Sequence, residues 1–194
     1  MKRLAYGIIA SLIPSLALAA PALVPTRDVS VDYTLTAPGQ AAQTLQLFYN
    51  ATTEHARISS NAGYYVLADL PAGQAQLVIP ALHAIINTPD FSALTTELFH
   101  AADTAHFTAL GTGHYAGLSC ETYQVTDRNG TARACLTKDG VVLHFVGHDA
   151  QGDAEVTATS VNYAPQPASL FTPPAGLTPL TLPPGALKAL LAPQ

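Results

Sequence analysis

Short segments in which apolar and polar side chains alternate dominate this sequence. In residues 29–37, VSVDYTLTA, the apolar residues Val29, Val31, Tyr33 and Leu35 alternate with polar ones. Side chains two positions apart in a strand point to the same face of a sheet, so this pattern predicts a half-buried β-strand. The same pattern recurs in 43–51, 55–60, 64–69, 75–80 and 82–87. Short turn-forming segments separate these stretches, which is typical of antiparallel hairpins.

The second half of the chain has the same organisation. Its alternation predicts strands over 105–110, 114–126, 131–137, 141–147 and 154–163. Asn129-Gly130 and Asp139-Gly140 fall between these strands, and both dipeptides favour tight hairpin turns because they tolerate positive φ. Eight of the fifteen prolines lie from Ala164 onward, so we expect that segment to run extended over the surface.

Residues 88–103 change to a helical period. Thr88 is a candidate N-cap, and Pro89 occupies the first helical position. Apolar residues then recur at the spacing of one helix face: Phe91, Leu94, Leu98, Phe99 and Ala102. An apolar stripe of this width must be buried, and the inner face of the sheet is the available partner. The pattern therefore predicts a mainly β protein of the α+β class, an antiparallel sheet with one central amphipathic helix.

The N-terminal segment indicates export. Lys2 and Arg3 precede an uncharged apolar run that ends in small residues, which is the arrangement of a secretory signal peptide. We predict a signal peptide over residues 1–19, with cleavage after Ala19 or, failing that, after Ala22. An uncleaved membrane anchor is the alternative, but Pro14 interrupts a run that is barely long enough to span a bilayer. We therefore expect a periplasmic or secreted protein that does not span the membrane after cleavage.

The charge of the mature chain limits its partners. Without Lys2 and Arg3 it has six basic and thirteen acidic side chains, a net charge of −7. An anionic surface of this kind argues against nucleic acid as a partner.

Cys120 and Cys135 are the only cysteines, and in an exported chain they are expected to form a disulfide. Zinc ligation would require closer cysteine spacing with histidines nearby, so we predict neither a metal nor a cofactor. If Thr126 faces Thr131 across the turn, Cys120 lies opposite Thr137 and approaches Cys135 only diagonally. We therefore predict a β-bulge near the turn that brings the two sulfurs together.

Several segments resemble a group of small exported bacterial proteins of unknown function whose domain is similar to the LolA-like lipoprotein-carrier fold. The resemblance lies in AGLSCETYQV, ACLTKDGVVL and the closing LFTPPAGL. It implies a sheet curved into a half-barrel over residues 20–185, with the helix packed in its concave face and a tail over 186–194. In the carrier relatives the cavity between sheet and helix shelters acyl chains.

No catalytic constellation is evident. Ser119 lies in GLSCE, which lacks the second glycine of a nucleophile elbow and is predicted to be a strand. A polar cluster of Glu97, His100, Asp103 and His106 has helical metal-ligand spacing, but a solvated helix face is the preferred interpretation. We predict that the protein is not an enzyme.

The apolar residues of the inner face allow two interpretations. They form either a solid core or the lining of a pocket for an apolar ligand. The candidate ligand-binding residues are Tyr33, Leu35, Leu45, Leu47, Leu67, Phe91, Leu94, Leu98, Phe99 and Phe145. The leading hypothesis is a periplasmic protein that binds a lipid, an acyl chain or another apolar molecule. The alternatives are an envelope protein with a solid core that binds another protein, and a hydrolase of unknown substrate.

Overall fold

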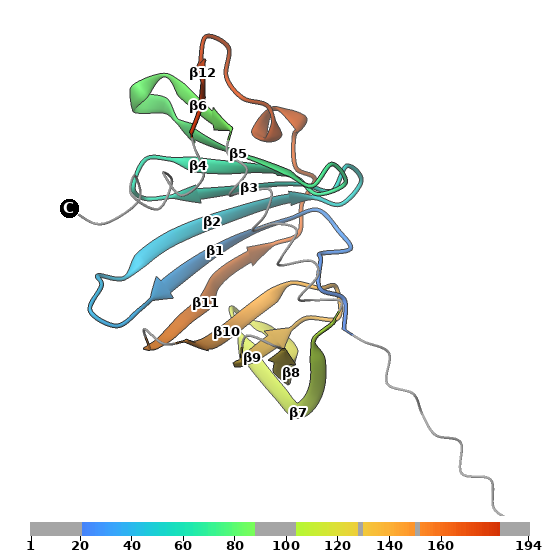
Figure 1. The fold of residues 1–194 in the computed structure, drawn as a ribbon. Helices are drawn as coiled ribbons and strands as arrows, with labels where there is room; N and C mark the ends of the chain where they lie inside the picture. The colour runs from blue at the N-terminus through green and yellow to red at the C-terminus, as the bar shows by residue number, and fades with distance from the viewer. Residues whose placement is uncertain (1–20, 88–103, 128–129, 150–151, 183–194) are drawn as a thin grey trace, which may run out of the picture.

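The computed structural model describes residues 21–87, 104–127, 130–149 and 152–182. Twelve strands in these ranges form one sheet (Figure 1). Two short 3₁₀ turns also lie in them, η1 (Pro80–Leu82) and η2 (Ala168–Phe171). The strands are β1 (Val29–Thr36), β2 (Gln43–Asn50), β3 (His55–Ser60), β4 (Tyr65–Asp69), β5 (Gln74–Ile79), β6 (Ala84–Asn87), β7 (His106–Tyr115), β8 (Leu118–Asp127), β9 (Gly130–Leu136), β10 (Val142–Asp149), β11 (Gly152–Asn162) and β12 (Thr178–Thr181).

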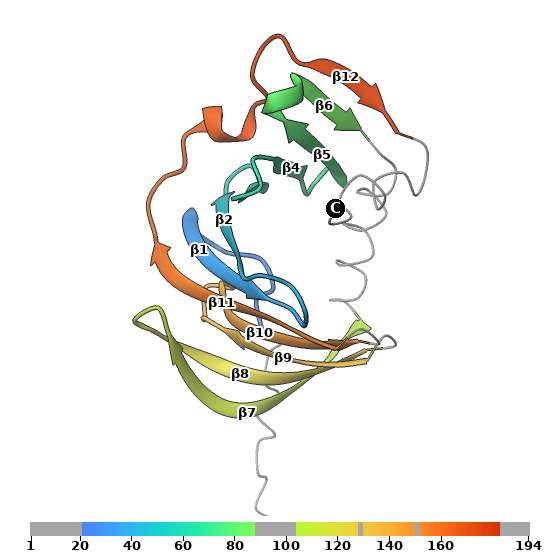
Figure 2. The same cartoon turned by 90° about the vertical axis from the view of Figure 1, so that its left-hand side faces the viewer.

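The sheet consists of two meanders that meet at its centre. Its strand order is β12-β6-β5-β4-β3-β2-β1-β11-β10-β9-β8-β7. All neighbours pair antiparallel except β12, which pairs parallel with β6. Short hairpins join most neighbours, so local turn chemistry determines this topology, and the β1–β11 pairing joins the two halves. Figure 2 shows an open bend with β12 at one end and β7 at the other. The sheet is not strongly curled.

The predicted strands are confirmed with one boundary error. The sequence predicted two strands here, at 105–110 and 114–126, with a break at residues 111–113. In the structure β7 runs through all three residues and ends at Tyr115. The turn lies instead at Ala116-Gly117, where both residues have positive φ, as a two-residue hairpin requires. The predicted helix, residues 88–103, lies outside the described residues.

The N-terminal residues 21–28 are fixed at the β9–β10 turn. The Thr26 amide donates a hydrogen bond to the Asp139 carbonyl at 2.9 Å. The Arg27 guanidinium lies 3.3 Å from the Asp139 carboxylate and 3.9 Å from the centre of the Tyr163 ring. Gly140 has positive φ, and a Cβ at that position would collide with the Val24 carbonyl, so only glycine fits there.

The C-terminal segment covers the outer side of β3–β6. Tyr65, Leu67, Val78 and Ile85 form a buried cluster with Leu177. Over residues 164–182 the segment runs extended as predicted, apart from the η2 turn. β12 was not predicted, and its pairing with β6 joins residues about a hundred positions apart.

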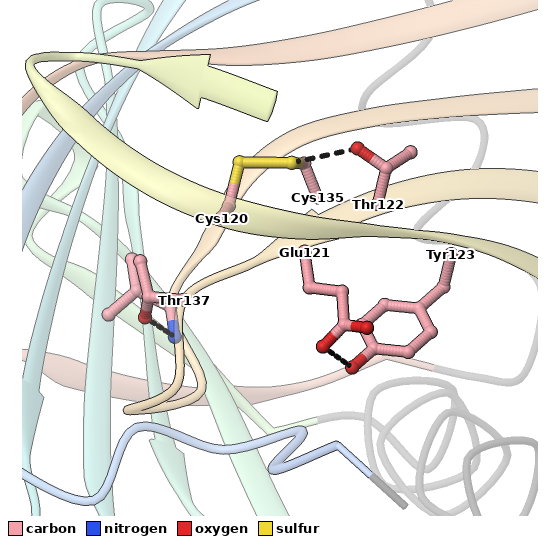
Figure 3. The surroundings of a disulfide bond; sticks show 7 residues. Cys120, Glu121, Thr122, Tyr123, Cys135 and Thr137 are labelled. Atoms are coloured by element: carbon pink, nitrogen blue, oxygen red, sulfur yellow. Dashed lines mark hydrogen bonds between the residues drawn. A yellow bond between two sulfur atoms is a disulfide. The ribbon is translucent and has the colours of Figure 1, made fainter. Parts of the chain in front are cut away.

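The predicted disulfide is present between β8 and β9 (Figure 3). Thr126 pairs with Thr131 as expected, and Thr122 is the residue opposite Cys135, so the bridge runs diagonally with a Cα–Cα distance of 5.4 Å. The predicted bulge in this hairpin is wrong, because the β8–β9 register is continuous from Glu121 to Asp127. The diagonal cysteines thus lie within bridging distance without a bulge between Glu121 and Asp127.

Candidate ligand-binding face of the sheet

Five of the predicted ligand-binding residues lie on one face of the sheet, which we call the inner face: Tyr33, Leu35, Leu45, Leu47 and Phe145. Tyr33 of β1 pairs directly with Leu45 of β2. Leu35 pairs with Val156 of β11, which pairs in turn with Phe145 of β10. Directly paired residues share a face, so these side chains form an apolar band across four adjacent strands.

The band continues across β3, where Ile58 pairs with Leu47. Ile58 is 42% exposed, one of few large apolar side chains exposed to this degree among the described residues. Leu45, Leu47 and Phe145 are half-buried. Ile58 was not among the predicted residues, although it is the only large apolar residue of its strand. Among the described residues, this part of the inner face is therefore an apolar surface that remains accessible.

Tyr33 contributes a half-buried ring with a satisfied hydroxyl group. Its Oη donates a hydrogen bond to the Val142 carbonyl at 2.9 Å. Burial, followed by repulsion from Tyr163, raises the pKa of the Tyr33 phenol well above its ordinary value. The side chain is thus a neutral, fixed part of the band.

Leu67 lies on the opposite, outer face. It pairs with Arg57 of β3, and Arg57 pairs with Phe48 of β2. Phe48 follows Leu47 directly in the strand, so it points to the face opposite that of Leu47. Leu67 is buried in the cluster with Leu177 and is part of the packing under the C-terminal segment. The other predicted residues, Phe91, Leu94, Leu98 and Phe99, lie outside the described residues.

A hollow lies beside the disulfide and is lined by residues of the N-terminal segment, of β8 and of the β9–β10 turn. It encloses about 910 Å³ and is lined by Arg27, Leu118, Tyr123, Lys138 and Tyr163, among others. Its lining includes two cations and two acids, Glu121 and Asp139, so its charge favours neither sign. Figure 3 shows Glu121 and Tyr123 on the side of β8 away from the disulfide, with the Tyr123 hydroxyl donating to Glu121 Oε2 at 2.7 Å. Burial, and then this hydrogen bond, raise the pKa of Tyr123 to about 12.

Ser119 lies within β8 and lines this hollow, as expected for a strand serine. It pairs with His114 of β7, and both side chains are exposed. Of the predicted metal cluster, Glu97, His100 and Asp103 lie outside the described residues, while His106 is exposed on β7. Elsewhere in the described ranges no three His, Cys, Asp or Glu side chains gather as a metal site would require.

None of the helical elements described is long and apolar enough to cross a membrane.

The sequence matches no protein-family model and no curated protein. Solved structures do share its fold. A conserved protein of Thermus thermophilus is 8% identical with a TM-score of 0.60, over 81% of this chain and 91% of that chain. MucB, in the Pseudomonas aeruginosa MucA/MucB complex, is 15% identical with a TM-score of 0.55, over 81% of this chain.

The chain spans 62% of the length of MucB. A LolA superfamily protein from Nitrosomonas europaea, of the fold that the sequence resembles, also matches, at 12% identity with a TM-score of 0.39 over 77% of this chain and 91% of that one. The Thermus thermophilus protein and MucB therefore share the fold of this chain. The disulfide fits a location outside the cytoplasm.

Proposed function

We propose that this chain is a non-enzymatic periplasmic or secreted protein that binds a lipid, an acyl chain or another apolar molecule on its inner face. The observation that carries the proposal is the apolar band across β3, β2, β1, β11 and β10, aligned by strand register and accessible at Ile58. Apolar ligand sites are concave surfaces of this composition with few polar groups. The half-barrel closed by the helix predicted at residues 88–103 belongs to the same proposal.

Native mass spectrometry of the protein purified from its own cell envelope, followed by lipid extraction, tests the proposal. We expect a bound mass that extracts into organic solvent. The fluorescent fatty acid cis-parinaric acid serves as a defined probe in parallel. A protein that carries no apolar adduct and gives no saturable probe signal would refute the proposal.

Two substitutions locate the site. Ile58→Asp places a charge in the apolar band, and because Ile58 is already 42% exposed, the change costs little in folding. Thr44→Asp places the same charge on the outer face of the adjacent strand, where Thr44 is exposed. We expect Ile58→Asp to weaken probe binding at least tenfold and Thr44→Asp to leave it unchanged. Equal effects from the two variants would contradict a site on the inner face.

A second candidate function is binding of an envelope protein. It is favoured by the structure of the MucB relative, which was solved in complex with MucA. Co-purification of one stoichiometric protein, unaffected by Ile58→Asp and by lipid extraction, would favour this function over the first.

A further inference from the structure

The hollow beside the disulfide adjoins the apolar band of the inner face. Tyr123 of β8 pairs with Ala134 of β9, which pairs in turn with Phe145 of β10. Paired residues share a face, so Tyr123 lies on the inner face, and Figure 3 shows Glu121 on the same side of β8. Tyr123 also lines the hollow. The band and the hollow therefore meet at this tyrosine.

The hollow has room for a small polar group between apolar walls. Its volume of about 910 Å³ lies within the range of about 300–1,000 Å³ that is typical of small-molecule sites. Leu118, Leu136 and Tyr163 form apolar parts of its lining. Leu136 pairs directly with Glu121, so an apolar and a charged side chain lie next to each other. An amphipathic molecule matches this lining better than a purely apolar one.

Two of the four charged side chains in the hollow neutralise each other. The Arg27 guanidinium lies 3.3 Å from the Asp139 carboxylate and also contacts the Tyr163 ring. One acid and one cation remain, Glu121 and Lys138. Both are exposed, and neither forms an ion pair within the described ranges. These two opposite charges match a ligand that carries an ammonium group and an anion on one molecule.

We propose that the hollow binds the headgroup of a zwitterionic phospholipid whose acyl chains lie along the apolar band. The Lys138 ammonium donates hydrogen bonds to the phosphate, and the Glu121 carboxylate accepts them from the ammonium group of the ligand. A phosphoethanolamine headgroup carries both of these charges. The inference rests on the proposed function, because it names the class of lipid that the inner face binds.

An anionic headgroup suits the hollow less well. It has a partner in Lys138 but brings none for Glu121, and a phosphate and a carboxylate repel each other. The net charge of the chain is negative, which adds to this repulsion. Because Glu121 and Lys138 are exposed, each ion pair contributes only about two- to fivefold in affinity. The hollow therefore determines which headgroup is preferred, while the band supplies most of the affinity.

Displacement of cis-parinaric acid from the exported, processed protein tests this inference. The competitors are dihexanoyl phosphatidylethanolamine and dihexanoyl phosphatidylglycerol, which have the same acyl chains but differ in the ammonium group. We expect phosphatidylethanolamine to displace the probe at a concentration about two- to fivefold lower. Calorimetry with glycerophosphoethanolamine, the headgroup without acyl chains, should show binding about tenfold weaker or more than that of the intact lipid.

Two variants test the roles of the charges. Glu121→Gln keeps an acceptor for the Tyr123 hydroxyl but removes the anion, so the preference should shift toward phosphatidylglycerol. Lys138→Gln removes the partner of the phosphate, which both lipids carry, and should weaken both while the preference for phosphatidylethanolamine remains. Arg133→Gln is the matched control, because Arg133 is exposed and directly precedes Ala134, so it points to the outer face. We expect no effect from it.

The outcomes separate this inference from the proposed function. Equal displacement by both lipids would overturn the headgroup site and leave lipid binding on the inner face intact. An unchanged preference in Glu121→Gln would overturn the site as well. Binding of the free headgroup as tight as that of the lipid would also overturn it, because the hollow would then be a site for a free zwitterion. A protein that binds neither lipid nor probe would refute both the inference and the proposed function.

Discussion

Asp28 connects three parts of the chain that are distant in sequence, and its replacement should be among the most destabilising polar changes. Its Oδ1 accepts a hydrogen bond from the Ala51 amide at 2.8 Å, and its Oδ2 accepts one from the Gln166 amide at 2.9 Å. The Asn50 side chain adds a longer bond of 3.2 Å to Oδ2. One carboxylate thus holds the N-terminal residues, the β2–β3 turn and the start of the C-terminal segment together.

The expected cost follows from these bonds. A hydrogen bond to a charged group contributes about 1.5–3 kcal/mol, and we take the lower value because the site is only part-buried. Loss of both backbone bonds in Asp28→Ala should therefore lower the free energy of unfolding by about 3 kcal/mol. Asp28→Asn keeps the shape but turns an NH₂ group toward one of the amide donors. We expect it to cost about 2 kcal/mol, because one bond is lost and two donors then face each other.

Urea denaturation followed by circular dichroism measures both variants. Asp32→Asn is the matched control, because among the described residues the Asp32 carboxylate makes a single exposed side-chain bond, to Gln46 at 2.8 Å. We expect this control to lie within about 0.5 kcal/mol of the wild type. An Asp28→Asn protein as stable as the wild type would refute the conclusion that Asp28 holds these three segments together. The same holds for a control that loses as much stability as Asp28→Asn.

Three further outcomes are expected. Reduction of the Cys120–Cys135 bridge, which closes a 15-residue loop, should cost about 3 kcal/mol and lower the melting temperature by roughly 6–12 °C in calorimetry; an unchanged melting curve would count against a stabilising bridge. The hydrogen bond with His144 lowers the pKa of Glu155. The contribution of the ionised Glu155 carboxylate to stability is therefore present at neutral pH and is lost as pH falls from about 4.5 through the lowered pKa. Glu155→Gln should therefore lose less than about 1 kcal/mol at pH 7 and show a flatter acid limb of stability. Burial raises the pKa of the Tyr33 phenol, so the contribution of the neutral phenol to stability is present at neutral pH and is lost as pH rises above about 10. Tyr33→Phe should lower the free energy of unfolding by about 1 kcal/mol at pH 7 and flatten the fall in stability at alkaline pH. An unaltered fall at alkaline pH would contradict the raised pKa.

The strands were predictable because alternation is a local property, but the role of Gly113 was not. Glycines at positions 111 and 113 suggest a turn when only neighbouring residues are considered. In the structure a Cβ at Gly113 would lie 2.7 Å from the Cys135 sulfur, closer than a real contact allows. The glycine is therefore required where β7 approaches the disulfide, and this requirement comes from a residue 22 positions away in the sequence.

The face of an isolated strand was equally difficult to assign. In β4 both alternating sets are apolar, with Tyr65 and Leu67 on one side and Val66 and Ala68 on the other. Either set is compatible with an inner face, and only the pairing with β3 decides between them. The sequence therefore predicted the inner-face positions of β1 and β2, where one set is mostly polar, and misplaced Leu67, where neither set is.

The two faces of the sheet also differ in how their apolar surface is covered, and this difference favours the inner face as the ligand site. On the outer face the chain supplies its own cover. Leu177 packs on the Leu67 cluster, and the Leu170 carbonyl accepts a 3.4 Å hydrogen bond from Arg57. A proline-rich segment suits this role because it lies extended over a sheet and loses little conformational entropy when it does so. The inner face has no equivalent cover over Ile58 among the described residues, so an apolar molecule bound there would remove from water a surface that this part of the chain leaves exposed.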